Sequence, residues 1–390
     1  MPVPPLPSAA DGLPPPWKRP DFLGRAPAGG YGYLSESSAR PCSLEELREA
    51  VGRGPDERVH FVWGPETGRL VPTAELPEVF ESLRGAQLAR AEEVLRSKTI
   101  WAVVAGLGVY FFGEQLLGLP LSWLAMMWGA FFLLPMVDAL VQRREWARAR
   151  VADAPALGEA SRFLHWLAWR RTSKTTHVII GALVVTWLLS EAANLDRSIR
   201  VFAMDTAGVK AGAWWKPLTC FFLHGGIVHL VFNSMALSRL GKWVEGLTEA
   251  AWVPLILLLS TLGGSLAGYV LPPDVPSVGA SGGVLGLLGF LLVFSRHPGR
   301  AIPPAFQRLL WQWVAYVVVL GLIGWKVIDN AAHVGGLLAG AGLGAIANAL
   351  MSASHPPVRT PWAAAVGWPA AALLAATAAW MIWVFAKAVA

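Results

Sequence analysis

Long apolar stretches separated by short polar connections fill the chain from residue 99 to its C-terminus. The hydrocarbon core of a bilayer needs about 20 consecutive, mostly apolar residues of α-helix to cross it. We find nine such stretches, at residues 99–118, 121–141, 177–195, 217–239, 250–271, 280–296, 306–325, 330–350 and 365–387. Because a helix satisfies its backbone hydrogen bonds within one segment, these stretches predict an all-α polytopic membrane protein.

The composition also indicates a membrane protein. Of the 390 residues, 54% are hydrophobic and 15% are charged, whereas soluble domains have about 45–50% and about 25%. The 20 Trp residues agree with this class, because Trp gathers at the two interfaces of a bilayer. We therefore interpret the net charge of +6 as an orientation signal and expect no nucleic-acid partner. The two Cys residues lie far apart and predict no disulfide framework.

Basic residues are concentrated on alternate connections between the apolar stretches. Residues 142–174 are strongly basic, and 239–249 and 296–308 also carry Arg or Lys. Such connections remain cytoplasmic, so we expect these segments and the N-terminus on the cytoplasmic side, with residues 196–213 as an outer loop. The first residues lack the apolar region of a signal peptide. Abundant Arg, Ala, Gly and Pro are typical of a GC-rich bacterium, and we expect a bacterial cytoplasmic membrane.

The N-terminal part of the chain has a different character. Residues 1–39 are rich in Pro and predict a disordered tail. Residues 40–98 predict a small soluble cytoplasmic α/β module with a helical linker, since Ser43 and Glu46 form a capping-box pattern and two strand patterns follow. This module has no cluster of catalytic residues, so we expect it to bind a partner or ligand that the sequence does not identify.

The apolar region divides into a core and additional helices. Residues 99–141 predict an extra transmembrane hairpin, and residues 142–176 a basic cytoplasmic linker. Residues 177–350 predict a core of six transmembrane helices, and residues 351–390 one more helix after it. The prediction is therefore a six-helix core with about three extra transmembrane helices.

One serine, Ser281, lies between glycines at the start of the stretch 280–296. The orientation of the stretches places Ser281 and His333 at one depth, near the outer ends of two helices that both run inward. Ionisable residues inside a span are costly and are candidates for function. Taken alone, Ser281 is better explained as a small packing residue, and His333 as a structural or proton-relay residue. Ser265 has no histidine at its depth and is interpreted as a packing residue.

A second polar group lies in the stretch 217–239. His229 and Asn233 are four residues apart and therefore lie on one helical face. Donors on one face suit the stabilisation of a developing negative charge. His224 would lie about 140° from His229 around a continuous helix. The H-E-x-x-H pattern of a helical zinc site is absent, and we expect no metal and no cofactor.

Three motifs together resemble the rhomboid intramembrane serine proteases. They are Gly279-Ala280-Ser281-Gly282, His224 with His229 and Asn233, and Ala332-His333-Val334-Gly335-Gly336, in the family's order and spacing. The resemblance covers roughly residues 177–350 and implies the family's six-helix core. It also implies a serine endopeptidase that hydrolyses peptide bonds in or near transmembrane segments of membrane-protein substrates, with Ser281 as nucleophile and His333 as general base.

The resemblance implies roles for the residues around this dyad. His229, Asn233 and the backbone N–H of Ser281 would form the oxyanion hole, and His224 and Gly279 would support it. The chemistry agrees, because a serine hydroxyl is a weak nucleophile until a base removes its proton. The start of a helix also supplies free N–H groups to a developing anion.

Other residues near the dyad are expected to be structural. Gly336 and Gly340 form a GxxxG pattern that would let their helix approach the Ser281 helix closely. By resemblance, Glu245 and Trp215 are structural residues near the site. Asp329, four residues before His333, is expected to cap a helix and not to orient the imidazole.

Two positions depart from the family pattern. Lys216 stands where the family commonly has Arg, and a lysine lacks the two-pronged hydrogen bonding of a guanidinium. Leu285 stands where many rhomboids carry an aromatic ring against the histidine, so the ring of His333 must be oriented in another way. The alternative is a catalytically silent rhomboid-like protein that binds membrane clients. A transporter would require broken helices or repeated halves, and the sequence shows no such repeat.

Overall fold

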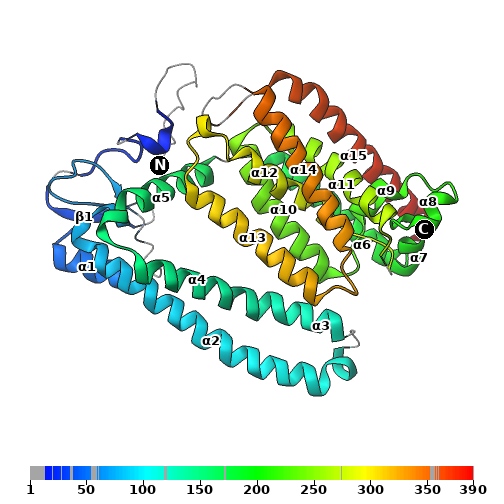
Figure 1. Cartoon of the computed structure of the whole chain (residues 1–390), viewed down its shortest axis with the longest axis horizontal. Coiled ribbons are helices and arrows are strands. Elements are labelled where there is room, and N and C mark those ends of the chain that lie inside the picture. Colours follow the sequence, from blue (N-terminus) through cyan, green and yellow to red (C-terminus); the bar gives the residue numbers. More distant parts are fainter. Residues whose placement is uncertain are drawn as a thin grey trace. The chain divides into compact units, whose positions relative to one another are not determined.

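The computed structural model describes residues 14–389 except 20, 28, 36–37, 54–58, 60, 118–120, 171–172, 274, 352–355, 357 and 359. Figure 1 shows the course of the chain. The chain forms two compact units. Unit 1 comprises Met1–Trp169, Pro303–Phe306 and Tyr316–Gly324, and unit 2 comprises Arg170–Ile302, Gln307–Ala315 and Trp325–Ala390.

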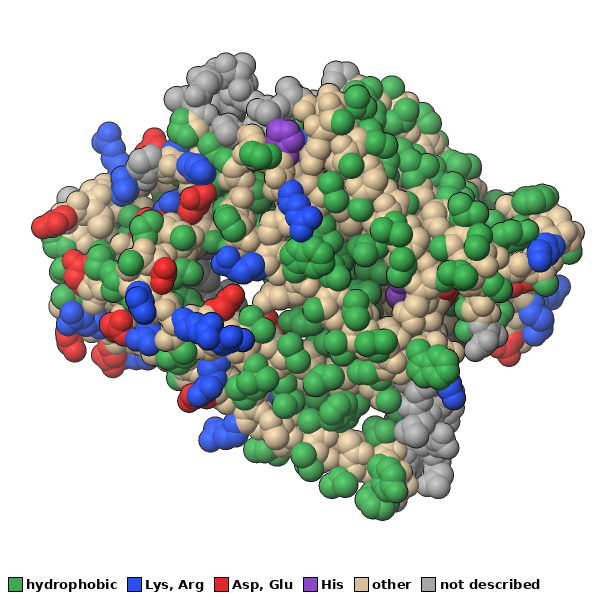
Figure 2. Space-filling model, viewed as in Figure 1, with side chains coloured by type: hydrophobic (Ala, Val, Ile, Leu, Met, Phe, Trp, Pro, Cys, Tyr) green, Lys and Arg blue, Asp and Glu red, His purple; other side chains and the backbone are tan. Residues whose placement is uncertain are grey.

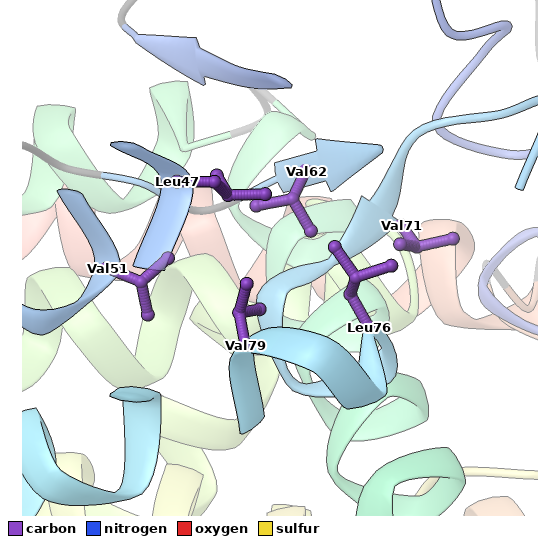
Figure 3. Packing of buried hydrophobic residues seen from close by; sticks show 6 residues of the cluster. All are labelled: Leu47, Val51, Val62, Val71, Leu76 and Val79. Atoms are coloured by element: carbon purple, nitrogen blue, oxygen red, sulfur yellow. The ribbon is translucent and has the colours of Figure 1, made fainter. Parts of the chain in front are cut away.

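Unit 1 contains a small antiparallel sheet with the strand order β2-β1-β3-β4. Its strands are β1 (Tyr31–Ser35), β2 (Ser38–Cys42), β3 (Phe61–Trp63) and β4 (Val71–Pro72). Helix α1 (Leu44–Gly52) begins with the predicted capping box, in which the Ser43 backbone N–H donates to the Glu46 carboxylate over 2.7 Å. Aliphatic side chains from the sheet and the helices pack together beside it, as Figure 3 shows for Leu47, Val51, Val62, Val71, Leu76 and Val79.

Part of residues 1–39, which were predicted to be a disordered tail, is folded. Trp17 lies in the short 3-10 helix η2 (Pro16–Lys18) and is fully buried, with its ring centroid 4.6 Å from that of Trp166. Strand β1 also falls inside this range and pairs with both β2 and β3. The aromatic side chains of this stretch bury enough apolar surface to offset the entropy of ordering it. Residues 1–13 lie outside the described residues.

The extra hairpin begins within the N-terminal module. Helix α2 (Pro77–Leu117) is continuous over 41 residues and therefore joins the charged helix of the module to the first apolar stretch. The return arm consists of α3 (Leu121–Trp128), a π-helical turn η5 (Gly129–Leu133) and α4 (Leu134–Arg148), and it runs beside α2 (Figure 1). The Trp128 indole N–H donates to the Ala102 carbonyl over 2.8 Å. Figure 2 shows hydrophobic side chains over much of this hairpin, as a lipid-facing surface requires.

The predicted basic linker, residues 142–176, contains folded helices. After α4 come the 3-10 helix η6 (Val151–Asp153) and α5 (Ala154–Trp169). The α5 residues Phe163, Trp166 and Leu167 are buried. The apolar face of α5 therefore gives these residues a packing role in unit 1, which the charge pattern did not indicate.

Unit 2 consists mainly of helices in its described residues. These helices are α6 (Lys174–Ala192), α7 (Leu195–Phe202), α8 (Thr206–Lys210), α9 (Lys216–Thr219), η7 (Cys220–Phe222), α10 (Ile227–Leu247), α11 (Trp252–Val270), α12 (Ser281–Phe294), η8 (Pro298–Arg300), α14 (Asn330–Leu350) and α15 (Pro361–Val389). Helix α13 (Pro304–Ile323) has residues in both units.

Seven helices of the described residues are long and apolar enough to cross a membrane, and a bent pair would make an eighth. The bent pair corrects the predicted span 217–239, because Lys216–Phe222 and Ile227–Leu247 meet at 93°. The break contains Gly226, whose φ of +145° a residue with a side chain rarely adopts. The predicted span 280–296 is the 14-residue helix α12, which is too short to cross a bilayer unaided. Most of its residues are buried by protein, so it does not need to span the lipid alone.

Helices α12 and α14 touch through the backbone of their glycines. A Cβ added to Gly336 would lie 2.1 Å from the Gly282 carbonyl oxygen, and one added to Gly340 would lie 1.9 Å from that of Gly286. On the other helix, a Cβ on Gly289 would lie 2.0 Å from the Leu337 oxygen. Real Cβ atoms essentially never come within 3.0 Å of another atom in this way. Glycine at these positions is therefore required by the distance between the two helices.

This contact predicts that Gly340→Ala destabilises the protein, because the new methyl group must push α12 and α14 apart. Overpacking of this kind typically costs about 1–3 kcal/mol. Gly342→Ala is the matched control on the same helix, since its Cβ would have no atom within 4 Å. We expect thermal unfolding in detergent to show a lower midpoint for Gly340→Ala and no loss for Gly342→Ala. Equal losses in both variants would contradict the backbone contact.

Candidate active site

Ser281 and His333 meet at the starts of two helices. Ser281 is the first residue of α12, and His333 lies in the first turn of α14. The Ser281 Oγ and His333 Nε2 atoms are 2.8 Å apart. Glycines set this distance, because Gly282, next to the serine, touches Gly336, three residues after the histidine. An imidazole whose Nε2 accepts can remove the hydroxyl proton.

Asp329 acts as the N-cap of α14. Its Oδ1 accepts a hydrogen bond from the Ala332 backbone N–H over 2.8 Å. Neither Asp329 Oδ2 nor His333 Nδ1 has a hydrogen-bond partner among the residues that the structure describes. The described site is thus a serine–histidine pair in which this carboxylate caps a helix.

Gly279 lies against the polar face of α10. Its φ is +113°, and an added Cβ would lie 2.7 Å from His229 Nε2 and 3.3 Å from Asn233 Nδ2. The Gly279 backbone N–H donates to the Cys220 carbonyl over 2.9 Å. Asn233 is buried, and its Nδ2 has no partner within the described part of the chain. The structure therefore brings an amide donor and an imidazole beside the segment that leads into Ser281.

His224 lies in the break between η7 and α10 and is fully buried. Its ring centroid is 5.1 Å from that of His229, at an interplanar angle of 69°. The continuous-helix geometry expected for these two histidines therefore does not apply, because the bend turns His224 back toward His229. His224 contacts an oxyanion candidate, as a supporting residue would.

Glu245 holds the first turn of another helix. Its buried carboxylate accepts hydrogen bonds from the Thr176 backbone N–H over 2.9 Å and from the Thr176 hydroxyl over 2.5 Å. A Cβ on Gly241 would lie 2.5 Å from the same hydroxyl oxygen. Gly241 and Glu245 thus join the C-terminal half of α10 to the start of α6.

Ser265 and Leu285 each have a simple place in the packing. Ser265 donates to the Pro217 carbonyl over 2.8 Å, which joins α11 to α9. Leu285 is buried in α12, one turn after Ser281. A leucine cannot stack on an imidazole, so the ring of His333 is held at Nε2 by Ser281 and by the glycine contacts of its helix.

Lys216 and Asp205 form a partly buried ion pair in the segment before α10. The Lys216 ammonium contacts the Asp205 carboxylate and donates to the Arg200 carbonyl over 3.0 Å. Lys216 thus forms an ion pair although it lacks the two parallel hydrogen bonds that an arginine guanidinium can make. Beside it, the Trp215 indole N–H donates to the Val201 carbonyl over 3.1 Å. These contacts tie the start of α9 to the end of α7 and to the segment that follows α7.

Two opposing effects act on the Asp205 carboxyl. Burial alone would raise its pKa, but hydrogen bonds from Lys216 and from the Gly208 backbone N–H, together with the charge of Lys216, outweigh burial and lower the pKa below its ordinary value of 3.8. A carboxyl with a lowered pKa stabilises the fold above its ordinary pKa and loses this contribution as the pH falls.

The sequence analysis missed one contact beside the site. Met204 and Ser277 form an isolated antiparallel bridge, with N–H to O distances of 2.9 Å from Met204 and 2.8 Å from Ser277. Both residues are in connections without a strand pattern, so their spacing in the sequence gives no signal. No group of three or more His, Cys, Asp or Glu that could hold a metal ion occurs in the described ranges.

The ion pair predicts that Asp205→Asn destabilises the protein at neutral pH, because the Lys216 ammonium loses its counter-charge. A fully buried pair costs about 3–5 kcal/mol when one partner is removed, and we expect less here because Asp205 is partly exposed. Unfolding midpoints of wild type and Asp205→Asn should differ at pH 7 and converge as the pH falls below the ordinary aspartate pKa. A difference that stays constant with pH would contradict this role of the carboxylate.

Comparison with known proteins identifies the family. The family model described as Rhomboid domain matches residues 211–350, which include Ser281 and His333. Rhomboid protease GluP of Bacillus subtilis is 33% identical over 172 residues, which is 42% of this chain and 33% of GluP. RHOMBOID-like protein 2 of Arabidopsis thaliana is 37% identical over 135 residues, or 33% of this chain and 41% of that protein. The chain thus covers less than half of both relatives.

A shorter relative is matched over most of its length. YdcA of Bacillus subtilis, whose name also includes the words rhomboid protease, is 32% identical over 168 residues, which is 42% of this chain and 82% of YdcA. The matched domain and the seven apolar helices also make the protein an integral membrane protein. Its sequence therefore belongs to the rhomboid family.

Proposed function

We propose that this protein is an intramembrane serine endopeptidase that uses Ser281 and His333. The observation that carries the proposal is the 2.8 Å distance between Ser281 Oγ and His333 Nε2 at the adjoining starts of α12 and α14. The similarity to proteins named as rhomboid proteases supports an intramembrane protease. Neither residue has a packing role that explains this contact, because the glycines on both helices already make the close approach.

The first step is attack on a substrate carbonyl. As Ser281 Oγ forms a bond to the carbonyl carbon, its proton moves to His333 Nε2. The carbonyl oxygen becomes an anion, and His333 then gives the proton to the leaving amine as the peptide bond breaks. Water releases the acyl group in a second round, in which His333 again accepts and returns a proton.

The developing oxyanion needs donors that are already in place. The Ser281 backbone N–H belongs to the free amides of the first helical turn. The Asn233 amide and the His229 ring lie beside Gly279, two residues before the nucleophile. Removal of one such donor typically costs about 2.7–4 kcal/mol of transition-state stabilisation. Three donors from two elements would therefore contribute most of the catalysis.

The substrates we propose are membrane proteins that present a short stretch of small or helix-breaking residues near the outer face. A carbonyl in an intact helix is hydrogen-bonded and shielded, so the helix must unwind before Ser281 can attack. The orientation we propose places the N-terminus in the cytoplasm and the chain in a bacterial cytoplasmic membrane, because the basic connections lie on one side. The module at residues 40–98 would bind a ligand or partner that does not enter the chemistry.

One observation favours a second candidate function, the binding of membrane clients without cleavage. Leu285 provides no aromatic ring for His333, so the imidazole has one support fewer than the family pattern supplies. The serine hydroxyl within hydrogen-bond distance of the ring argues for catalysis over this alternative.

The nucleophile is tested by reaction with a fluorophosphonate probe and by cleavage of a transmembrane substrate in detergent. We expect Ser281→Ala and His333→Ala to lose labelling and at least about a thousandfold in turnover. Ser265→Ala is the matched control, since this serine also follows glycines but bonds to Pro217. Labelling of folded Ser281→Ala would exclude this nucleophile, and an unlabelled, inactive wild type would favour client binding.

The oxyanion donors are tested through Gly279. Gly279→Ala would force a methyl group against His229 and Asn233, and we expect turnover to fall about a hundredfold or more. Gly212→Ala is the control, because Gly212 has a similar φ of +98° but no atom within 4 Å of an added Cβ. Similar turnover in the two variants would show that backbone strain, and not the donors, explains any loss.

A further inference from the structure

The C-terminal helix α15 packs on Phe202, which lies two residues before Met204 of the Met204–Ser277 bridge. Phe202, the last residue of α7, is almost fully buried, with its ring centroid 5.4 Å from that of Trp380 and 5.3 Å from that of Phe385. Both pairs are edge-on, an arrangement that aromatic rings favour. Trp380 also contacts Trp215, at 6.2 Å between centroids.

The opposite end of α15 is fixed to the start of α11. The Trp252 indole N–H donates to Thr360 Oγ1 over 3.0 Å, and the Trp252 and Trp362 rings lie 5.2 Å apart. A Cβ on Gly367 would lie 2.2 Å from the Ala251 carbonyl oxygen, so the two backbones touch. Helix α15 is therefore held to unit 2 at both ends, and its position is transmitted to Phe202.

Phe202 is connected to the catalytic serine by a short path. The Phe202 carbonyl accepts from Thr219 Oγ1 over 2.7 Å, and Met204, two residues later, exchanges both backbone hydrogen bonds with Ser277. Two residues after Ser277, Gly279 lies against His229 and Asn233. Those residues of the connection from α11 to α12 that the structure describes form no helix or strand, so they depend on such outside contacts for their position.

We propose that α15 is a positioning element of the active site: Trp380 and Phe385 fix Phe202, and Phe202 fixes the Met204–Ser277 bridge that sets Gly279 and the oxyanion donors. The helix lies outside the residues that the rhomboid domain model matches, 211–350. The inference rests on the proposed function for its kinetic consequence, and on the ring contacts and hydrogen bonds for its structural one.

The kinetic consequence should be a loss of turnover and not of substrate binding. A displacement of about 1 Å in a catalytic group can cost about a hundredfold. We expect the double variant Trp380→Ala/Phe385→Ala to lose about 10- to 100-fold in kcat with little change in KM. Trp383→Ala is the matched control, because this tryptophan is on the same helix but its ring lies against Lys387, 4.1 Å from the ammonium, whereas Trp380 contacts Phe202.

Rescue distinguishes positioning from general damage. Met204 and Ser277 form a hydrogen-bonded antiparallel pair, whose Cα atoms are typically about 5.5 Å apart, within the usual range of about 4.4–6.8 Å for disulfides. A Met204→Cys/Ser277→Cys disulfide, added to the double variant, should restore kcat when the disulfide is oxidised. Reduction of the disulfide should lower kcat again. Each sample thus serves as its own control.

A second readout does not need enzymatic activity. Hydrogen exchange of the peptide that contains Ser277 and Gly279 should be faster in Trp380→Ala/Phe385→Ala than in wild type or Trp383→Ala, because both amides are hydrogen-bonded in the native site. Unchanged exchange would overturn the inference even if the wild type cleaves nothing. Faster exchange with unchanged kcat in an active enzyme would also overturn it, while the proposed function would stand.

Discussion

The backbone contact between α12 and α14 is the constraint on which the site depends. In a lipid environment, apolar side chains gain little by leaving the lipid for a helix interface, so close packing must hold the helices together. Gly336 and Gly340 lie so close to the carbonyl groups of Gly282 and Gly286 that neither position on α14 can carry a side chain. The Gly282–Gly336 part of this contact lies within one turn of Ser281 and His333, so it sets the distance between hydroxyl and imidazole. Helix α11 continues the packing on another face of α14, where Gly263 approaches Gly335.

A backbone hydrogen bond joins the break before α10 to the segment that leads into Ser281. At the break before α10, the chain leaves helical geometry inside the apolar part of unit 2, and backbone groups there need partners. The Cys220 carbonyl, at the start of the last turn before the break, accepts from the Gly279 N–H. The same bond places Gly279 beside His229 and Asn233. The irregular backbone at the break is thus stabilised by the segment that leads into Ser281.

The sequence could indicate which residues lie together in two cases. Either the residues are close in the chain, or the predicted orientation of their apolar stretches assigns them one depth. His229 and Asn233 share a face because they are one helical turn apart. Ser281 and His333, which the orientation predicted from the sequence places at one depth, lie 2.8 Å apart between Oγ and Nε2. Contacts that join distant segments without a periodic pattern could not be predicted from the sequence. The pair Gly225-Gly226 was a local signal of the broken helix, but a long apolar run concealed it. The burial of Trp17 and the bridge between Met204 and Ser277 had no such signal, since each depends on a partner far along the chain.

The division of the chain into two units places the proposed chemistry in one of them. Ser281, His333 and the residues around Gly279 belong to unit 2, and so do the Lys216–Asp205 pair and the aromatic residues of α15. Loops keep catalytic groups in place only when a rigid scaffold surrounds them. In unit 2 that scaffold includes a helix beyond the matched domain, and the active-site loop is supported from two directions: by the break before α10 and by the segment that α15 covers. Unit 1, with the sheet and the long hairpin, supplies none of these residues.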